Sequence, residues 1–137
     1  MPEPPQAPLV LAVDPGTHKC GVAVVDAGRG VLARQVVDAA DLLDAVRRLL
    51  ADHPVTHLVV GDRTGSRRAR ALLAEVAGDR PVILVAEHLT SLDARRRYFR
   101  ENPPRGLRRL VPPGLRVPPG PIDDYVAVIL AERYLSG

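Results

Sequence analysis

The sequence predicts an α/β fold around a five-stranded mixed sheet, in which three antiparallel strands are followed by two parallel strands and helices lie on both faces. Three short apolar runs open the chain, and turn sequences at residues 14–16 and 26–30 separate them. Beyond them, continuous apolar runs alternate with segments of helical periodicity, which favours parallel strands joined by right-handed crossovers. With 137 residues, the chain has the size of one domain.

The individual elements follow from apolar periodicity and from turn and capping signals. The expected strands cover residues 9–13, 21–26, 31–37, 57–61 and 81–86. The expected helices cover residues 39–51, 66–77, a segment that opens at Thr90, and residues 122–135. Asp38 is placed to cap the first helix, and Thr90 to Asp93 form a capping-box sequence for the third. This order of strands and helices is that of the ribonuclease H fold.

Two segments are expected to lack regular structure within this single domain of residues 1–137. Residues 1–7 are predicted to be a flexible tail. Residues 102–121 contain seven prolines, three glycines and four arginines, which predicts a flexible loop. The chain shows no signal-peptide pattern, no run long enough to span a membrane and a single cysteine, Cys20, which we interpret as a core residue. A cytoplasmic location without membrane contact is the expectation.

The basic residues are concentrated in one part of the chain. Thirteen arginines and five acidic residues lie between Arg63 and Arg116, whereas the first 62 residues are net acidic. Guanidinium groups bind phosphate oxygens in a bidentate manner, so a nucleic-acid partner is favoured, although solvated helix faces would give the same pattern. The chain has no tryptophan, three tyrosines and one phenylalanine. We therefore expect recognition of phosphates and shape rather than base stacking.

Four acidic residues stand at strand or helix ends of the predicted fold. Asp14 ends the first strand, Glu87 follows the strand at residues 81–86, and Asp123 and Asp124 open the last helix. Each could be structural alone, as a turn residue, a solvated strand end or a helix cap. If Asp14, Glu87 and one of the last pair converge, their hard oxygen ligands would suit Mg²⁺ or Mn²⁺. Two such ions could support phosphodiester hydrolysis.

Three segments of the chain resemble motifs of the YqgF/RuvX family. They are DPGTHKCGVAVVD at residues 14–26, AEHLTSLDARRRYF at residues 86–99 and PIDDYVAVILAERYL at residues 121–135. The resemblance implies catalytic, metal-binding acids at Asp14, Glu87 and Asp123, with Asp124 as a further metal ligand. The family is similar in fold to Holliday-junction resolvases and is implicated in maturing the 5′ end of 16S ribosomal RNA precursors. Ala86 and His88 stand where the family usually has Asp and Arg. The resemblance implies that these residues border the scissile phosphate, so the two substitutions affect how the substrate is positioned.

The expected function is a metal-dependent nuclease that acts on RNA, in particular on a ribosomal RNA precursor. The basic residues expected to contact nucleic acid are Lys19, Arg63, Arg67, Arg68, His88, Arg105, Arg108 and Arg109. The helix that opens near Gly65 and Ser66 could also offer backbone N–H groups to a phosphate. One alternative is a resolvase of branched DNA, which would require two symmetric active sites and hence a homodimer. The other is a nucleic-acid-binding module without catalysis.

Overall fold

The computed structural model describes residues 7–63, 65–88 and 90–136, so that most of the predicted tail at residues 1–7 lies outside the described residues. The strands are β1 (Leu9–Asp14), β2 (Lys19–Asp26), β3 (Gly30–Asp38), β4 (His57–Gly61) and β5 (Val82–Val85). The helices are α1 (Leu42–Asp52), α2 (Ser66–Val76), α3 (Thr90–Glu101) and α4 (Asp123–Ser136). Three short 3₁₀ segments, η1 (Ala39–Asp41), η2 (Gly106–Leu110) and η3 (Pro113–Leu115), complete the chain.

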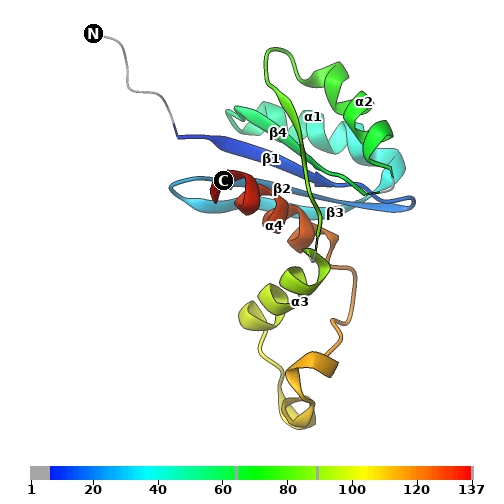
Figure 1. Cartoon of the computed structure of the whole chain (residues 1–137), viewed down its shortest axis with the longest axis vertical. Helices are drawn as coiled ribbons and strands as arrows, with labels where there is room; N and C mark the ends of the chain where they lie inside the picture. The colour runs from blue at the N-terminus through cyan, green and yellow to red at the C-terminus, as the bar shows by residue number, and fades with distance from the viewer. Residues whose placement is uncertain (1–6, 64, 89, 137) are drawn as a thin grey trace.

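The five strands form one mixed sheet in the order β3-β2-β1-β4-β5. Strand β1 pairs antiparallel with β2 and parallel with β4, and β4 pairs parallel with β5. Every residue of β1 is buried because a strand lies on each side of it and helices cover both faces (Figure 1). The predicted fold class is therefore confirmed.

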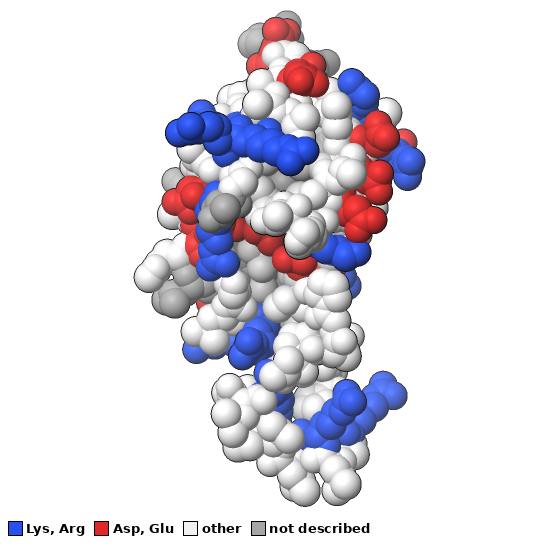
Figure 2. Space-filling view, turned by 90° about the vertical axis from the view of Figure 1, so that its right-hand side faces the viewer, with Lys and Arg blue, Asp and Glu red and all other residues white. Residues whose placement is uncertain are grey.

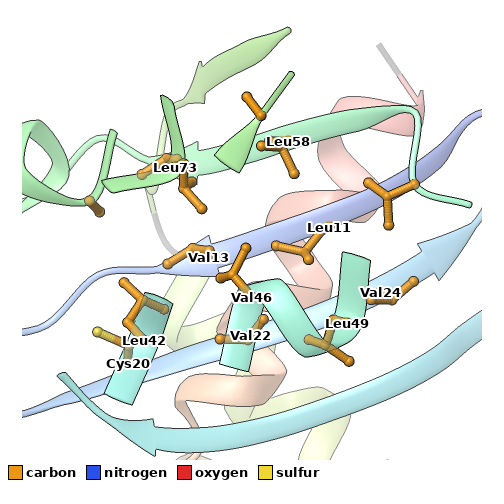
Figure 3. Close-up of a cluster of buried hydrophobic side chains, with 14 of the residues drawn as sticks. Leu11, Val13, Cys20, Val22, Val24, Leu42, Val46, Leu49, Leu58 and Leu73 are labelled. Carbon is orange, nitrogen blue, oxygen red and sulfur yellow. The ribbon is translucent and has the colours of Figure 1, made fainter. Parts of the chain in front are cut away.

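Alternate residues of β1 enter two separate cores. Leu11 and Val13 face helices α1 and α2, where they pack with Val46 and Leu73 (Figure 3). Val10 and Ala12 face α4 on the other side of the sheet. Each buried Val or Leu side chain contributes about 1.5–3 kcal/mol to folding, before the conformational entropy is subtracted. Helices are packed on both faces of the sheet, and this packing holds the ends of its strands in place.

We call α3 and the loop at residues 102–121 the arm, because together they project away from the sheet (Figure 1). Helix α3 packs principally against α4. Two ion pairs hold these helices together: Arg97 Nη1 lies 2.8 Å from Glu132 Oε1, and Arg133 Nη2 lies 3.0 Å from Asp93 Oδ2. The arm is therefore attached to the domain through α4, whose first residues include two of the predicted site acids.

Three local predictions were wrong in detail. Asp38 makes no side-chain cap; it ends β3 and accepts a hydrogen bond from Lys19 Nζ at 2.8 Å. Thr90 is the first residue of α3, and its hydroxyl donates to the Glu87 carbonyl at 2.8 Å instead of accepting a bond from the helix. The proline-rich loop contains the 3₁₀ segments η2 and η3, because such short turns need few backbone donors.

Within the part of the chain that the structure describes, none of the helices combines the length and the apolar character needed to cross a bilayer.

Candidate functional site

Asp14 lies at the centre of the candidate site because it ends the central strand of the sheet. Its side chain is almost fully buried. Glu87, which follows β5, and Asp123, which opens α4, both lie close enough to raise the pKa of the Asp14 carboxyl. The structure thus brings together the three acids predicted from the sequence to be catalytic.

Two glycines beside Asp14 make this close approach possible. Gly21 lies directly opposite Asp14 on β2, and a Cβ atom there would collide with the backbone carbonyl of Asp123. Gly61 ends the parallel strand β4, and a Cβ atom there would collide with the carboxyl group of Glu87. Any larger residue at either position would push an acid away from Asp14.

Glu87 is held by the backbone that follows β4. Its Oε2 accepts a hydrogen bond from the Arg63 backbone N–H at 3.0 Å, and its own N–H donates to Asp62 Oδ1 at 3.0 Å. Its Oε1 is buried without a hydrogen-bond partner among the described residues. A buried carboxylate oxygen that accepts no hydrogen bond lowers the stability of the fold. A proton or a cation bound to this atom would remove that cost.

The pKa of Asp14 is raised from its usual value of 3.8 to about 9. Burial is the largest cause, followed by the hydrogen bond and the negative charge of Glu87, and then by Asp123. A neutral Asp14 can donate its proton to a neighbouring carboxylate, which relieves the repulsion among the three acids. A divalent cation at the same place would take over the role of that proton.

The chemistry of these donors fits a divalent cation that prefers oxygen ligands. All three side chains are carboxylates, which supply the oxygen ligands that Mg²⁺ and Mn²⁺ prefer, and the Glu87 Oε1 atom has no hydrogen-bond partner among the described residues. However, no group of three or more histidine, cysteine, aspartate or glutamate side chains in the described ranges is arranged to hold a metal ion. Metal binding at this site would therefore require the carboxylates to turn toward a common point.

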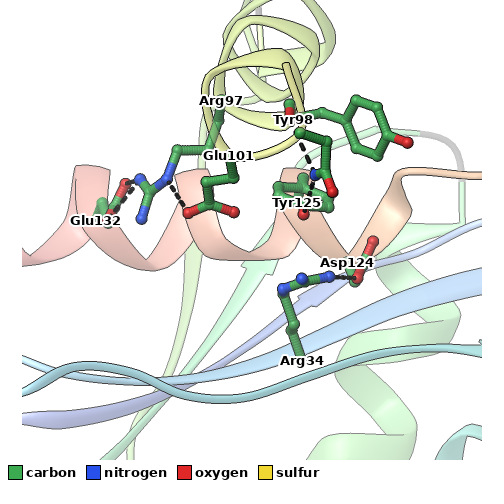
Figure 4. A network of polar contacts seen from close by, with 8 residues as sticks. Arg34, Arg97, Tyr98, Glu101, Asp124, Tyr125 and Glu132 are labelled. Carbon is green, nitrogen blue, oxygen red and sulfur yellow. Dashed lines mark hydrogen bonds and ion pairs between the residues drawn. The ribbon is translucent and has the colours of Figure 1, made fainter. Parts of the chain in front are cut away.

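Asp124, the fourth predicted metal ligand, makes a different contact. Its Oδ2 lies 2.7 Å from Arg34 Nη1, and the Arg34 guanidinium also lies 4.3 Å above the ring of Tyr125 (Figure 4). Asp124 is buried, so the arginine neutralises a charge that is largely shielded from water. A metal ion would have to compete with Arg34 for this carboxylate.

The Arg34 contact belongs to a polar network that reaches the arm. The Tyr125 hydroxyl accepts a hydrogen bond at 3.3 Å from Asn102 Nδ2, and Asn102 directly follows α3. Nearby, Arg97 pairs with Glu101 of its own helix at 3.0 Å. The network therefore joins the edge strand β3, the start of α4 and the base of the arm.

The predicted nucleic-acid contacts fall into two groups. Arg63 lies 3.5 Å from Glu87 Oε2, and Arg68 lines a hollow of about 160 Å³ with the turn at Pro15 and Gly16. His88 is exposed next to Glu87 in the chain. Arg63 and His88 thus adjoin Glu87, and Arg68 adjoins the turn that follows Asp14.

The remaining predicted contacts are less closely connected with the acids. Lys19 is paired with Asp38, and Arg67 is exposed on α2 beside a shallow hollow that Arg70 also lines. Arg105, Arg108 and Arg109 are exposed on the arm. A ligand would have to extend along the molecule to contact both groups.

The sequence prediction missed Gly21, Gly61 and Arg34. Gly21 lies within an apolar strand and Gly61 ends one, and an isolated glycine in a strand is a known sign of close backbone approach. If the pairing register of the strands were known, it would place both glycines beside Asp14. Arg34 gave no such signal, because its partner Asp124 lies 90 residues away in the sequence.

Comparison with known proteins defines the fold. No family model matches the chain, and no curated protein matches its sequence. Among solved structures, that of Thermus thermophilus RuvC has a TM-score of 0.58 with 17% identity, over 94% of this chain and 96% of that chain. T. thermophilus RuvC in complex with a Holliday junction substrate has a TM-score of 0.59 with 17% identity, over 90% of each chain.

A further similar structure is YeaZ from Pseudomonas aeruginosa, with a TM-score of 0.50 and 30% identity. The match covers 69% of this chain and 49% of YeaZ, so the chain spans about half the length of that protein. The five-stranded mixed sheet and the RuvC matches together show a RuvC-like ribonuclease H fold. At 17% identity, the likeness to RuvC establishes the fold alone.

Proposed function

We propose that the protein is a divalent-metal-dependent nuclease that hydrolyses phosphodiester bonds of RNA, in the 5′-end maturation of a 16S ribosomal RNA precursor. The observation that carries the proposal is the approach of Glu87 and Asp123 to Asp14 at the end of β1. Neighbouring carboxylates repel one another and two of these three are buried, so the cluster costs stability and marks a candidate functional site. The RNA precursor as substrate rests on the resemblance of three motifs to the YqgF/RuvX family.

In this proposal, Asp14, Glu87 and Asp123 hold one or two Mg²⁺ or Mn²⁺ ions. The bound ions would supply a Lewis acid and lower the pKa of a coordinated water molecule. The Arg63 backbone N–H orients the Glu87 carboxylate through its 3.0 Å hydrogen bond. Arg68, beside the turn that follows Asp14, and His88, next to Glu87 in the chain, would bind the phosphates that flank the scissile bond.

A resolvase of four-way DNA junctions is the second candidate. It is favoured by the match to RuvC in complex with a Holliday junction substrate. Resolving a four-way junction requires two cuts at symmetric positions, so a protein with this activity would have to act as a homodimer. The third candidate, a nucleic-acid-binding module without catalysis, is compatible with the lack of an assembled metal-ligand group in the described residues.

The first experiment measures cleavage of three labelled substrates by the purified protein with Mn²⁺ and with Mg²⁺. The substrates are single-stranded RNA, a precursor-like ribosomal RNA and a four-way DNA junction. Asp14→Asn and Glu87→Gln should each reduce cleavage by about a thousandfold or more, because each removes a charged ligand. Asp44→Asn, on the exposed surface of α1, is the matched control and should cleave like wild type.

Metal binding is measured separately from activity by thermal unfolding with increasing Mn²⁺. A ligand that binds only the folded state raises the melting temperature, so wild type should be stabilised and Asp14→Asn should not. Fast cleavage of the precursor supports the proposal, whereas junction cleavage by a dimer would replace it with resolution. If the protein binds nucleic acid without cleavage and without a Mn²⁺ shift, the binding module is correct.

A further inference from the structure

One hollow lies on the arm, away from the carboxylates. It has a volume of about 660 Å³ and lies between the end of α3 and the loop at residues 102–121; we call it the arm groove. Its apolar lining includes Tyr98, Phe99, Val111, Leu115 and Val117. This volume is in the range of pockets that accept several side chains of a ligand.

The surface around the arm groove is unusually apolar for a solvent-exposed loop. Four aliphatic side chains of the loop are at least 70% exposed, namely Leu107, Leu110, Leu115 and Val117. A single exposed leucine is ordinary, but several on one short segment mark a surface that another molecule covers. Aliphatic groups gain most from contact with other apolar side chains, so the partner must carry some.

The charges of the arm groove all have one sign. Residues 102–121 contain four arginines and neither lysine nor any acidic residue. Arg105, Arg108 and Arg116 line the groove. In Figure 2, the lower end of the molecule shows basic and uncharged residues, and the acidic residues gather above it. A complementary partner must therefore be acidic as well as apolar.

The basic surface continues along α3. A second hollow of about 390 Å³ shares Phe99 and Arg116 with the arm groove and is also lined by Arg95, Arg96 and Arg100. The two hollows together extend from the loop along α3, and arginines contribute to the lining of both. An extended polymer fits these dimensions better than a metabolite.

The chemistry of the arm groove favours a peptide over a nucleic acid. Sequence-tolerant binding of single strands relies on aromatic rings that stack on bases. Here Tyr98 already packs edge-on against Phe99 and Tyr125, with ring centroids 5.1 Å and 5.5 Å apart, and the exposed groups are aliphatic. Arginine and aromatic residues without lysine or acids are also the composition of protein–protein interface cores.

We propose that the arm groove binds an acidic amphipathic peptide segment of another protein. Its apolar side chains would lie against Val111, Leu115 and Val117, and its carboxylates would pair with Arg105 and Arg108. This assignment competes with the phosphate contacts predicted for the same two arginines. It does not depend on the nuclease proposal, because the groove and the carboxylates share no residue.

The test uses fluorescence anisotropy with the full chain and a short fluorescein-labelled peptide of glutamate and leucine. Companion probes are the same peptide with lysine in place of glutamate, the same peptide with serine in place of leucine, and oligouridylate. The double variants Leu115→Ser/Val117→Ser and Arg105→Glu/Arg108→Glu alter the groove at exposed positions. Val31→Ser and Arg48→Glu, which change exposed residues on β3 and α1, are the matched controls, and thermal unfolding checks that every variant is folded.

We expect the glutamate–leucine peptide to bind at least about tenfold more tightly than either companion peptide. Each groove double variant should weaken this binding about tenfold or more, and the two controls should bind like wild type. Failure of the glutamate–leucine peptide to bind, or equal binding by the groove variants, overturns the proposal. If oligouridylate binds instead and its binding is lost in Leu115→Ser/Val117→Ser, the groove is a nucleic-acid site.

Discussion

The end of β1 and the arm differ in how tightly their residues are packed. Around Asp14, buried carboxylates and two glycines are fitted so closely that a single added carbon atom would collide with a neighbour. On the arm, leucines are mostly exposed and Gly114 and Gly120 have no atoms near the position of a Cβ. The first region is built to hold charges in one fixed arrangement, whereas the second offers an open surface. The same substitution should therefore have opposite consequences in the two regions.

The largest difference is expected from glycine-to-alanine substitutions. Gly21→Ala should lower the free energy of unfolding by about 3 kcal/mol, because the new methyl group meets the backbone of α4 rather than a flexible side chain. Gly114→Ala should leave it unchanged or raise it slightly, by about 0.5 kcal/mol. Urea denaturation of both variants measures the difference. Equal stability of the two variants would show that the approach of α4 to Asp14 is looser than described.

A somewhat smaller effect is expected from Asp14→Asn in the absence of metal. Asp14 is protonated at about pH 9 and below in the folded protein, but only below about pH 3.8 when unfolded. Its contribution to stability is therefore fully present below pH 3.8 and is lost as the pH rises toward 9. Asp14→Asn, which cannot ionise, should be more stable than wild type at pH 8, by about 2 kcal/mol or more.

The measurement is the difference in unfolding free energy between wild type and Asp14→Asn from pH 4 to pH 9, with a chelator present. The gain from the substitution should grow steadily with pH. Asp44→Asn on the exposed face of α1 provides the control and should show no such trend. A gain that is independent of pH would mean that Asp14 is already ionised in the folded protein.

An intermediate effect is expected from the polar network at the base of the arm. Arg34→Ala should lower the free energy of unfolding by about 1.5 kcal/mol, because it leaves the buried Asp124 carboxylate without its partner. The exposed pair of Lys19 and Asp38 provides the comparison, and Lys19→Ala should change stability by less than about 0.5 kcal/mol. Asp124→Asn in the Arg34→Ala background should recover part of the loss. No recovery would mean that Arg34 acts through Tyr125 rather than through the ion pair.

The smallest effect is expected on the arm itself. Leu107→Ser and Leu110→Ser should each change the unfolding free energy by less than about 0.5 kcal/mol, since both side chains are already exposed. Leu58→Ala in the sheet, which is fully buried, should cost about 2–5 kcal/mol. Thermal and urea unfolding compare the three variants. A large loss for either arm variant would show that the arm packs against the domain in solution.

The sequence predicted most of the architecture because its patterns are local. The run Leu9 to Val13, the turn at Asp14-Pro15-Gly16 and the later apolar strands gave the strand positions to within two residues. Element ends were less accurate where a side chain had a choice of partners. Asp38 could cap a helix or bind Lys19, and the pairing of β2 with β3 places Lys19 directly opposite it. Such choices depend on strand register, which the apolar pattern does not specify.

The sequence by itself determined that Asp14 ends β1, that Glu87 follows β5 and that Asp123 opens α4, because apolar periodicity sets where each element begins and stops. Only the tertiary structure decided that Gly21 and Gly61 open the space through which these acids approach one another. It also decided that Asp124, next to Asp123 in the chain, turns to Arg34 on the edge strand. Contacts between segments so distant in sequence form only when helices pack on both faces of the sheet. Local sequence patterns do not specify that packing.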